Sequence, residues 1–147
     1  MEERTVLNSM PQQRVVSVAP EATVHKAAIV MTQANCGSVL VLGTDGALQG
    51  ILTERDLMTR VVARALDPAA TLVATVMTRN PICIPPETTV SDAIVIMIER
   101  GFRHLPVLRP GGKIVGVFSV RDALPREVGT AVSLAEFNEQ MNDAGGG

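Results

Sequence analysis

The sequence has almost no aromatic residues: it contains three phenylalanines, no tryptophan and no tyrosine in 147 residues. Apolar residues nevertheless make up 46 % of the chain, which is too many for a disordered protein. We therefore expect a packed core of valine, isoleucine, leucine, alanine and methionine. The length is sufficient for one compact domain or for two small units that share a core.

Cysteine and histidine are also scarce. The two cysteines, Cys36 and Cys83, lie far apart in the sequence, and neither histidine, His25 or His104, falls at metal-ligand spacing from a cysteine. This pattern favours two reduced, buried thiols in a cytoplasmic protein that requires no metal. We expect His25 to be an ordinary solvated histidine on a helix surface.

Further absences narrow the function. The formal net charge is only −2, which argues against a general nucleic-acid or anionic-membrane binder. No apolar run reaches the roughly 18–20 residues of a membrane span, and residues 1–8 lack the apolar stretch of a signal peptide. The chain contains no Walker A, Gly-x-Ser-x-Gly or His-Glu-x-x-His motif, so we do not expect an enzyme.

What the sequence does contain is a heptad that occurs twice. Residues 50–56 (GILTERD) return 66 positions later as residues 116–122 (GVFSVRD), and the same offset holds without a gap from Val16 to Met58. Other residues that the offset maps onto identical residues include Pro20 and Pro86, Thr23 and Thr89, Ala27 and Ala93, and Met31 and Met97. We interpret this as an internal tandem repeat.

Each repeat has the pattern strand, helix, strand, strand, helix. In the first repeat we expect a brief strand over residues 15–18, a helix capped by Thr23, a hairpin over residues 38–52 and a helix from Thr53 to about Leu66. The fold class is therefore α/β, with two β-α-β-β-α units. A unit of roughly 50 residues buries only a small core alone, so we expect the two to pack with pseudo-two-fold symmetry.

The second repeat follows the same order. We expect a strand over Ile82–Ile84, a helix capped by Thr89, a hairpin over residues 105–118 and a short helix from Ser119. The side chains expected to face inward on the first of these helices are Val90, Ala93, Ile94, Met97 and Ile98. The expected boundaries are a lead-in over 1–14, the first unit over 15–66, a linker over 67–80, the second unit over 81–125, and a C-terminal segment over 126–147. Within the linker we expect a short helical piece near residues 72–77, and within the C-terminal segment a helix over 126–142 that is followed by a flexible tail.

The helix after Thr53 carries an apolar stripe that is too wide for one buried face. Its members are Leu57, Met58, Val61, Val62, Ala65 and Leu66. One side of this helix can cover its own sheet, and the other side is left for a partner. We expect a homodimer.

The Thr53/Asp56 and Ser119/Asp122 pairs have two interpretations. A hydroxyl at the N-cap and an acid three residues later satisfy free N–H groups of a helix and suit its dipole. The same geometry can also dock a ligand, because the helix start offers N–H groups and the aspartate can accept hydrogen bonds from two ribose hydroxyls. The arginines that precede the two aspartates, and that could meet phosphate, are Arg55 and Arg121.

The repeated Gly-x-x-Thr/Ser-x-Arg-Asp turn, the run Arg103–Leu108 (RHLPVL) and the Val76-Met77-Thr78 segment together resemble a tandem pair of cystathionine-β-synthase (CBS) domains, a Bateman module. The resemblance covers about Val15 to Leu124. The closing residues 132–137 are similar to those of small stand-alone bacterial CBS-pair proteins.

The resemblance implies an adenosine-nucleotide site in each of two clefts, one on either side of the interface between the sheets. It places the ribose on Thr53 and Asp56 in one heptad and on Ser119 and Asp122 in the other. It places phosphate near Arg103 and His104, whereas the first repeat has Gly37 and Ser38 at those positions. We therefore expect unequal clefts, with the more phosphorylated or tighter-bound ligand beside Arg103 and His104. The residues implied to contact adenine are Val16, Val18, Ala27, Cys36, Ile82, Ile84, Ala93 and Phe102.

Two functions from different classes fit these observations. The first is a regulatory module that senses AMP, ADP, ATP or an NAD-type dinucleotide and signals to a separate, unidentified protein. The second is a dimeric scaffold that binds no nucleotide, in which the Thr/Ser and Asp pairs only cap helices. We favour the first, because a cap does not explain why both arginine and aspartate recur.

Overall fold

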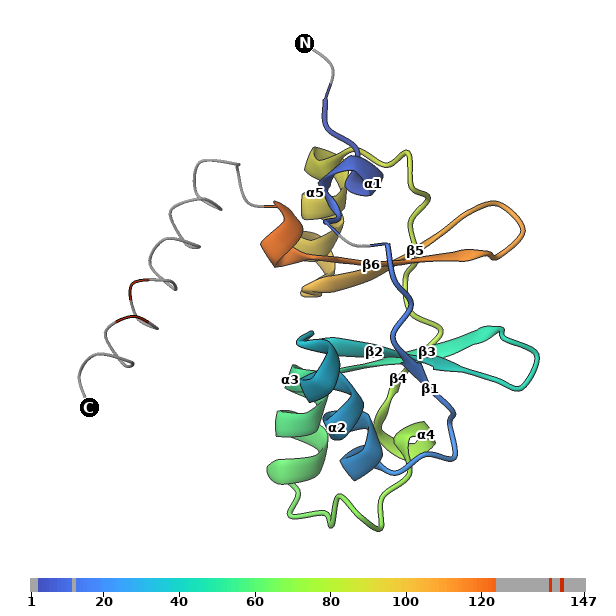
Figure 1. Ribbon diagram of the computed structural model, residues 1–147, viewed down its shortest axis with the longest axis vertical. Helices are drawn as coiled ribbons and strands as arrows, with labels where there is room; N and C mark the ends of the chain where they lie inside the picture. The colour runs from blue at the N-terminus through green and yellow to red at the C-terminus, as the bar shows by residue number, and fades with distance from the viewer. Residues whose placement is uncertain (1–2, 12, 124–137, 139–140, 142–147) are drawn as a thin grey trace.

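The computed structural model describes residues 3–11, 13–123, 138 and 141. It consists of two stacked units whose sheets lie in the middle and whose helices lie mainly on the outer sides (Figure 1). The elements of the first unit are β1 (Ser17–Val18), α2 (Val24–Ala34), β2 (Ser38–Leu42), β3 (Leu48–Thr53), α3 (Glu54–Asp56), the π-helical segment η1 (Leu57–Val62), α4 (Val73–Val76) and β4 (Thr78–Arg79). Those of the second unit are α1 (Val6–Ser9), α5 (Val90–Arg100), β5 (His104–Leu108), β6 (Ile114–Ser119) and the 3-10 helix η2 (Val120–Ala123).

The two hairpins have the same register, which confirms the repeat. Ser38 lies opposite Thr53 in the antiparallel β2–β3 pair, and His104 lies opposite Ser119 in the β5–β6 pair. Both pairs also shift register at the equivalent place, next to Leu42 and Leu108. The strand order is β1-β2-β3-β4 in the first sheet and β5-β6 in the second.

The first strand of the second unit is shorter than expected. Of the predicted strand Ile82–Ile84, only Ile84 pairs, through a single parallel bridge to Val107. Prolines at positions 81, 85 and 86 flank this stretch and cannot donate backbone hydrogen bonds to a ladder. The bridge still holds Ile84 in place, because its N–H donates to the carbonyl of Pro106 at 3.0 Å and its carbonyl accepts from Leu108 at 3.0 Å.

The lead-in belongs to the second unit. Helix α1 packs on that unit's core through Val6, which is fully buried, and the residue that follows the helix, Met10, is buried in the same core. The Val6 N–H donates to the carbonyl of Thr88 at 2.8 Å, and the Val90 N–H donates to the carbonyl of Arg4 at 2.8 Å. The chain therefore crosses from one unit to the other between α1 and β1, as Figure 1 shows.

The linker helix is confirmed and packs on the first unit in the way that α1 packs on the second. Val73 and Val76 of α4 are buried in the first core. The Val73 N–H donates to the carbonyl of Ala22 at 2.8 Å. Strand β4 then pairs antiparallel with β3, where Arg79 lies opposite Gly50.

The glycine that opens each heptad lies under one of these connecting segments. A Cβ on Gly50 would lie 2.8 Å from the carbonyl oxygen of Thr78, and a Cβ on Gly116 would lie 3.1 Å from that of Arg14. Real Cβ atoms rarely approach backbone so closely, so a side chain at either position would displace the strand or segment that crosses it. Glycine is needed at these two positions because the backbone of the connecting segment passes so close to them.

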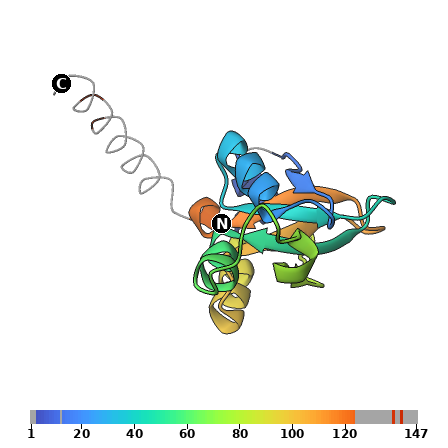
Figure 2. The same ribbon diagram turned by 90° about the horizontal axis from the view of Figure 1, so that it is seen from below.

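The two long helices are capped as expected. The hydroxyls of Thr23 and Thr89 accept from the N–H groups of Lys26 and Asp92 at 3.1 Å. Their buried faces contain Val24, Ala27 and Met31 in α2 and Val90, Ala93 and Met97 in α5. The inward position expected for Ile98 is wrong, because its side chain is 76 % exposed. Its helix, α5, and η1 lie on the same edge of the molecule, opposite α2 (Figure 2).

Other expectations need smaller corrections. Both cysteines are free thiols, but Cys36 is only partly buried and Cys83 is exposed. Burial nevertheless raises the pKa of the Cys83 thiol. The helix expected to run to about Leu66 ends at Val62. The predicted C-terminal helix over 126–142 lies almost entirely outside the described residues. In the part of the chain that is described, no helix has the length and apolar character needed to cross a bilayer.

Replacing Val6 by alanine tests whether the lead-in belongs to the second core. The change removes two carbon atoms from a fully buried site, so we expect the free energy of unfolding to fall by about 2 kcal/mol. Urea denaturation followed by circular dichroism measures this. Val15→Ala is the matched control, because Val15 is 44 % exposed, and should change stability by less than about 0.5 kcal/mol. Equal losses in the two variants would contradict the placement of α1.

Candidate functional site

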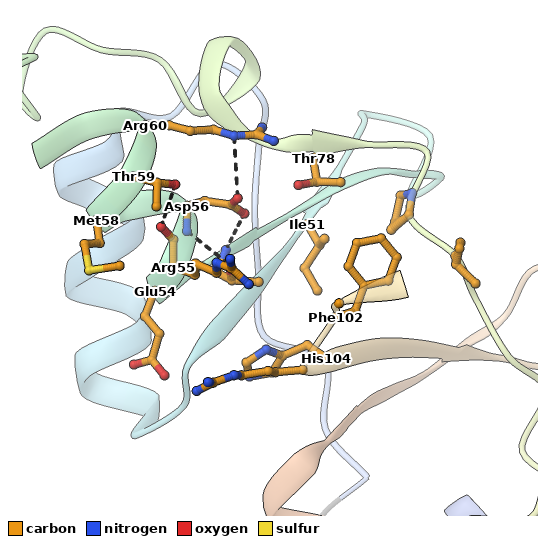
Figure 3. Close-up of a pocket in the computed structure, with 15 residues that line it drawn as sticks. Ile51, Glu54, Arg55, Asp56, Met58, Thr59, Arg60, Thr78, Phe102 and His104 are labelled. Atoms are coloured by element: carbon orange, nitrogen blue, oxygen red, sulfur yellow. Dashed lines mark hydrogen bonds and ion pairs between the residues drawn. The ribbon is translucent and has the colours of Figure 1, made fainter. Parts of the chain in front are cut away.

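A cavity of about 710 Å³ lies between the two units and contains the first heptad turn (Figure 3). Thr53 and Asp56 of the first unit line it together with Phe102 and His104 of the second. Figure 3 shows Asp56 on one side of the cavity and Phe102 and His104 on the other. Any molecule bound here would touch both units.

In a second cavity, of about 1040 Å³, the two units exchange roles. It contains the second turn, with Ser119 and Asp122, and faces Cys36, Gly37 and Ser38 of the first unit. Both volumes are close to the range of about 300–1,000 Å³ that is typical of small-molecule sites. Each predicted ribose pair is thus brought together with the residues that precede the hairpin of the other unit.

The first turn is a complete capping box. The Thr53 hydroxyl accepts from the Asp56 N–H at 3.2 Å, and Asp56 Oδ2 accepts from the Thr53 N–H at 3.0 Å. Asp56 is only 8 % exposed. Its other oxygen, Oδ1, lies 3.8 Å from Nε of Arg60, so the carboxylate faces a cation on the side that does not cap the helix.

The second turn is similar but closes differently. Oδ2 of Asp122 accepts from the Ser119 N–H at 3.0 Å and from the Ser119 hydroxyl at 3.2 Å. The serine hydroxyl therefore donates to the aspartate, whereas the threonine hydroxyl of the first turn accepts from backbone. The two turns therefore share their residue pattern, but the Thr53 hydroxyl is used as an acceptor and the Ser119 hydroxyl as a donor.

The arginines of the heptads line separate cavities. Arg55 lines the first cavity and Arg121 lines the second. Arg103 and His104 behave differently, because both line both cavities, as does Glu54. The expectation that Arg103 and His104 serve one cleft alone therefore needs correction. These two residues stand where the cavities meet, and each cavity has access to them.

Four of the residues implied to contact adenine line a cavity and four do not. The lining residues are Ile82 and Phe102 in the first cavity and Val16 and Cys36 in the second. The others, Val18, Ala27, Ile84 and Ala93, are buried in the two hydrophobic cores. The alanines face their own sheet from helices α2 and α5 and are fully buried, which removes them from the cavity walls.

Two arginines that the sequence analysis missed also line the cavities. Arg60 in the first cavity donates to the carbonyls of Val76 and Met77 at 3.0 and 3.1 Å, which ties η1 to the end of α4. Arg60 stands four residues after Asp56, a helical spacing from which the pair could have been predicted. Arg14 in the second cavity donates to the carbonyl of Ala34. Arg14 belongs to the segment that crosses between the units, and no local sequence pattern predicts that this segment reaches the cavity.

Burial lowers the pKa of the His104 imidazole, and this is the largest effect on it. The carboxylates of Glu54, Asp122 and Asp56 oppose the shift, and the nearby Arg103 guanidinium adds to it. The lowered pKa means that the neutral ring is favoured in the folded protein. His25, by contrast, is exposed on α2, as expected.

Comparison with known proteins establishes the family. The model of the CBS domain matches residues 7–63 and 73–128, so the chain belongs to the CBS domain family and carries two copies of the domain. Both matches begin in the short helices α1 and α4. This confirms the resemblance and the expected pair of CBS units.

The curated relatives include short proteins and much longer ones. An uncharacterized protein of Acidianus ambivalens is 35 % identical over 118 residues, which cover 80 % of this chain and 70 % of that protein. Among longer curated relatives the chain spans only 19 %, 24 % or 26 % of the length.

Solved structures show the same fold. A CBS-domain-containing protein from Agrobacterium tumefaciens is 30 % identical with a TM-score of 0.75, over 81 % of this chain and 90 % of that one. A CBS domain protein from Pyrobaculum aerophilum, determined in complex with AMP, has a TM-score of 0.75 at 23 % identity, over 88 % of this chain and 98 % of that one.

The lowered pKa of His104 predicts a pH effect on stability. Below about pH 6.5, the usual histidine pKa, the unfolded chain takes up a proton that the folded protein resists, so the free energy of unfolding falls as the pH drops. His104→Gln should lose less stability than the wild type between about pH 7 and pH 5.5, as measured by denaturant titrations at both values. His25→Gln keeps His104 and should retain the wild-type pH dependence. Identical pH dependences in the wild type and His104→Gln would contradict this assignment.

Proposed function

We propose that this protein is a regulatory module that binds adenosine nucleotides in its two clefts and transmits their occupancy to a separate protein. The observation that carries the proposal is the pairing of elements in each cavity. The Thr/Ser and Asp turn of one unit faces the residues that precede the hairpin of the other. A ligand held by both walls would join the two units, which is how binding would become a change that a partner can sense.

The chemistry of each wall suits one part of a nucleotide. The aspartates Asp56 and Asp122 are the candidates for the ribose hydroxyls, next to Thr53 and Ser119. Arginine and histidine side chains suit phosphate, and the candidates for it are Arg55, Arg121, Arg103 and His104. The apolar candidates for the adenine ring are Ile82 and Phe102 in the first cleft and Val16 and Cys36 in the second.

The ligand class is AMP, ADP, ATP or an NAD-type dinucleotide. AMP is present in the Pyrobaculum aerophilum protein, whose likeness to this chain is one of fold. The assignment of residues here therefore rests on this chain's own cavities and on the recurrence of Arg and Asp in both heptads. None of the roles proposed for these side chains requires a metal ion.

A dimeric scaffold without a nucleotide is the second candidate, and one observation favours it. Both aspartates already accept hydrogen bonds within their own turns, so capping alone gives each a structural role. The distinction between the candidates depends on the aspartate oxygen that does not cap, which a ligand would use and a cap would not.

Asparagine at positions 56 and 122 separates the two roles. Asn can still accept the backbone N–H with one oxygen, but it presents an NH2 group in place of the second oxygen. We expect Asp56→Asn and Asp122→Asn together to cost less than about 1 kcal/mol of stability and to abolish stabilisation by the ligand. Thermal unfolding with AMP, ADP, ATP, NAD, NADH and S-adenosylmethionine measures this, with GTP as the control nucleotide.

In the wild type, a ligand at about a hundred times its Kd should add about 2.7 kcal/mol, a shift of several degrees in Tm. Protein freed of carried-over nucleotide is required for the comparison. If no adenosine ligand shifts the wild-type Tm, the proposal is wrong and the scaffold is favoured. A shift that persists in the double variant would remove the aspartates from the site.

We also propose that the protein is a homodimer. Met58 and Val62 of η1 and Val95 and Ile98 of α5 are exposed, and η1 and α5 lie on the same edge of the molecule (Figure 2). Val62 is 72 % exposed, and exposed apolar faces of this kind mark interaction sites. A second copy of the chain would bring the same apolar side chains to the contact.

Lysine at positions 62 and 98 tests the dimer. We expect the wild type to sediment as a dimer at micromolar concentration and the Val62→Lys, Ile98→Lys variant to sediment as a monomer, because burying two charges on each side is unfavourable. Val15→Lys places a lysine at an exposed valine elsewhere and should remain a dimer. Sedimentation of the wild type as a monomer would refute this assignment.

A further inference from the structure

Three residues form a wall that belongs to both clefts. Glu54, Arg103 and His104 line the first cavity and also line the second. We call these three residues the shared wall. Among the residues that the structure describes, each of the other arginines at the cavities lines only one of them. These are Arg55 and Arg60 in the first cavity and Arg14 and Arg121 in the second.

The shared wall arises where the two repeats have the same backbone but different side chains. The Glu54 N–H donates to the carbonyl of Gly37 at 3.0 Å, and at the equivalent place in the second repeat the Val120 N–H donates to the carbonyl of Arg103 at 3.0 Å. Gly37 of the first repeat therefore corresponds to Arg103 of the second, and Glu54 of the first corresponds to Val120 of the second. The interface has one arginine at these equivalent positions, where a symmetric pair would have two.

The absence of a side chain at Gly37 leaves room for two members of the shared wall, Glu54 and His104. A Cβ at Gly37 would lie 3.0 Å from Glu54 Oε1 and 3.3 Å from His104 Nε2. The carboxylate and the imidazole thus fill the space beside Gly37. With Arg103 next to His104 in the chain, one cation, one anion and one imidazole separate the two clefts.

We propose that the two clefts share Arg103 as a phosphate-binding residue, so that two nucleotides bind to one chain with negative cooperativity. This inference rests on the proposed function and specifies how its two sites are coupled. A phosphate in one cleft engages the guanidinium of Arg103. A phosphate that then enters the other cleft meets a cation that is already paired, together with the negative charge of Glu54 and of the first phosphate.

The sharing of Arg103 is tested with variants that leave one cleft at a time. Asp122→Asn leaves the first cleft as the AMP site, and Asp56→Asn leaves the second. We expect Arg103→Gln to weaken AMP binding in both backgrounds by about tenfold or more, since a hydrogen bond to a charged group is lost in each. The matched controls are the heptad arginines. Arg55→Gln should weaken AMP binding only in the Asp122→Asn background, and Arg121→Gln only in the Asp56→Asn background.

The coupling is measured by isothermal titration calorimetry of the full chain with AMP. The two single-cleft variants give the intrinsic Kd of each cleft. In the wild type we expect the second AMP to bind about tenfold or more weakly than its intrinsic Kd predicts. Adenosine has no phosphate and should bind the two clefts independently. At about 1 M salt, where the Debye length is about 3 Å, the coupling for AMP should shrink.

The outcomes separate this inference from the function on which it rests. The sharing of Arg103 is refuted if two AMP molecules bind the wild type with their intrinsic affinities. It is also refuted if Arg103→Gln weakens AMP binding in one background only. Either result leaves nucleotide sensing intact. If the second adenosine is weakened as much as the second AMP, the coupling does not come from phosphate, and this result would also refute the inference. If neither AMP nor any other adenosine ligand of the thermal panel binds, the proposed function and this inference both fail.

Discussion

The passage of two connecting segments over Gly50 and Gly116 is the contact on which the rest of the structure depends. At each glycine a backbone carbonyl, that of Thr78 or of Arg14, would lie about 3 Å from a Cβ. These crossings let α4 and β4 close the first unit and let α1 close the second. The heptad turn follows each glycine directly, so the segment that completes a core also sets the position of the turn at the cavity.

The turns show how a structural role and a binding role can occupy the same residues. Asp56 caps a helix with one oxygen while the other faces Arg60 across 3.8 Å. Because the cap holds the carboxylate in a single orientation, the second oxygen is directed without the need for a ligand to order it. Preorganisation of this kind reduces the entropy lost when a ligand binds. The cap and the site are therefore compatible, and only the oxygen that does not cap distinguishes them.

Much of the fold could be predicted from the sequence because the repeat has a constant offset. Helices α2 and α5 and the two hairpins follow from periodicity, threonine caps and turn residues, and the turns of the candidate site follow from the recurring heptad. Ile98 was misplaced because apolar periodicity does not distinguish a core face from a face left for another chain. Other features depend on how the two units pack, which no local sequence pattern predicts. These are the position of α1, the presence of Arg14 at the second cavity and the position of Arg103 between the clefts.

The crossing of α1 also affects the order in which the units can form. The core of the first unit is drawn from a continuous stretch of chain between Val18 and Met77, whereas the core of the second joins Val6 and Met10 to residues from Ile84 onward. During synthesis the first unit can fold once its last strand has left the ribosome. Helix α1 is made before Thr88 and Val90 and must wait for them, which takes on the order of ten seconds at ordinary rates of translation. The first unit is thus available as a finished surface on which the second, with its returning N-terminal helix, is assembled.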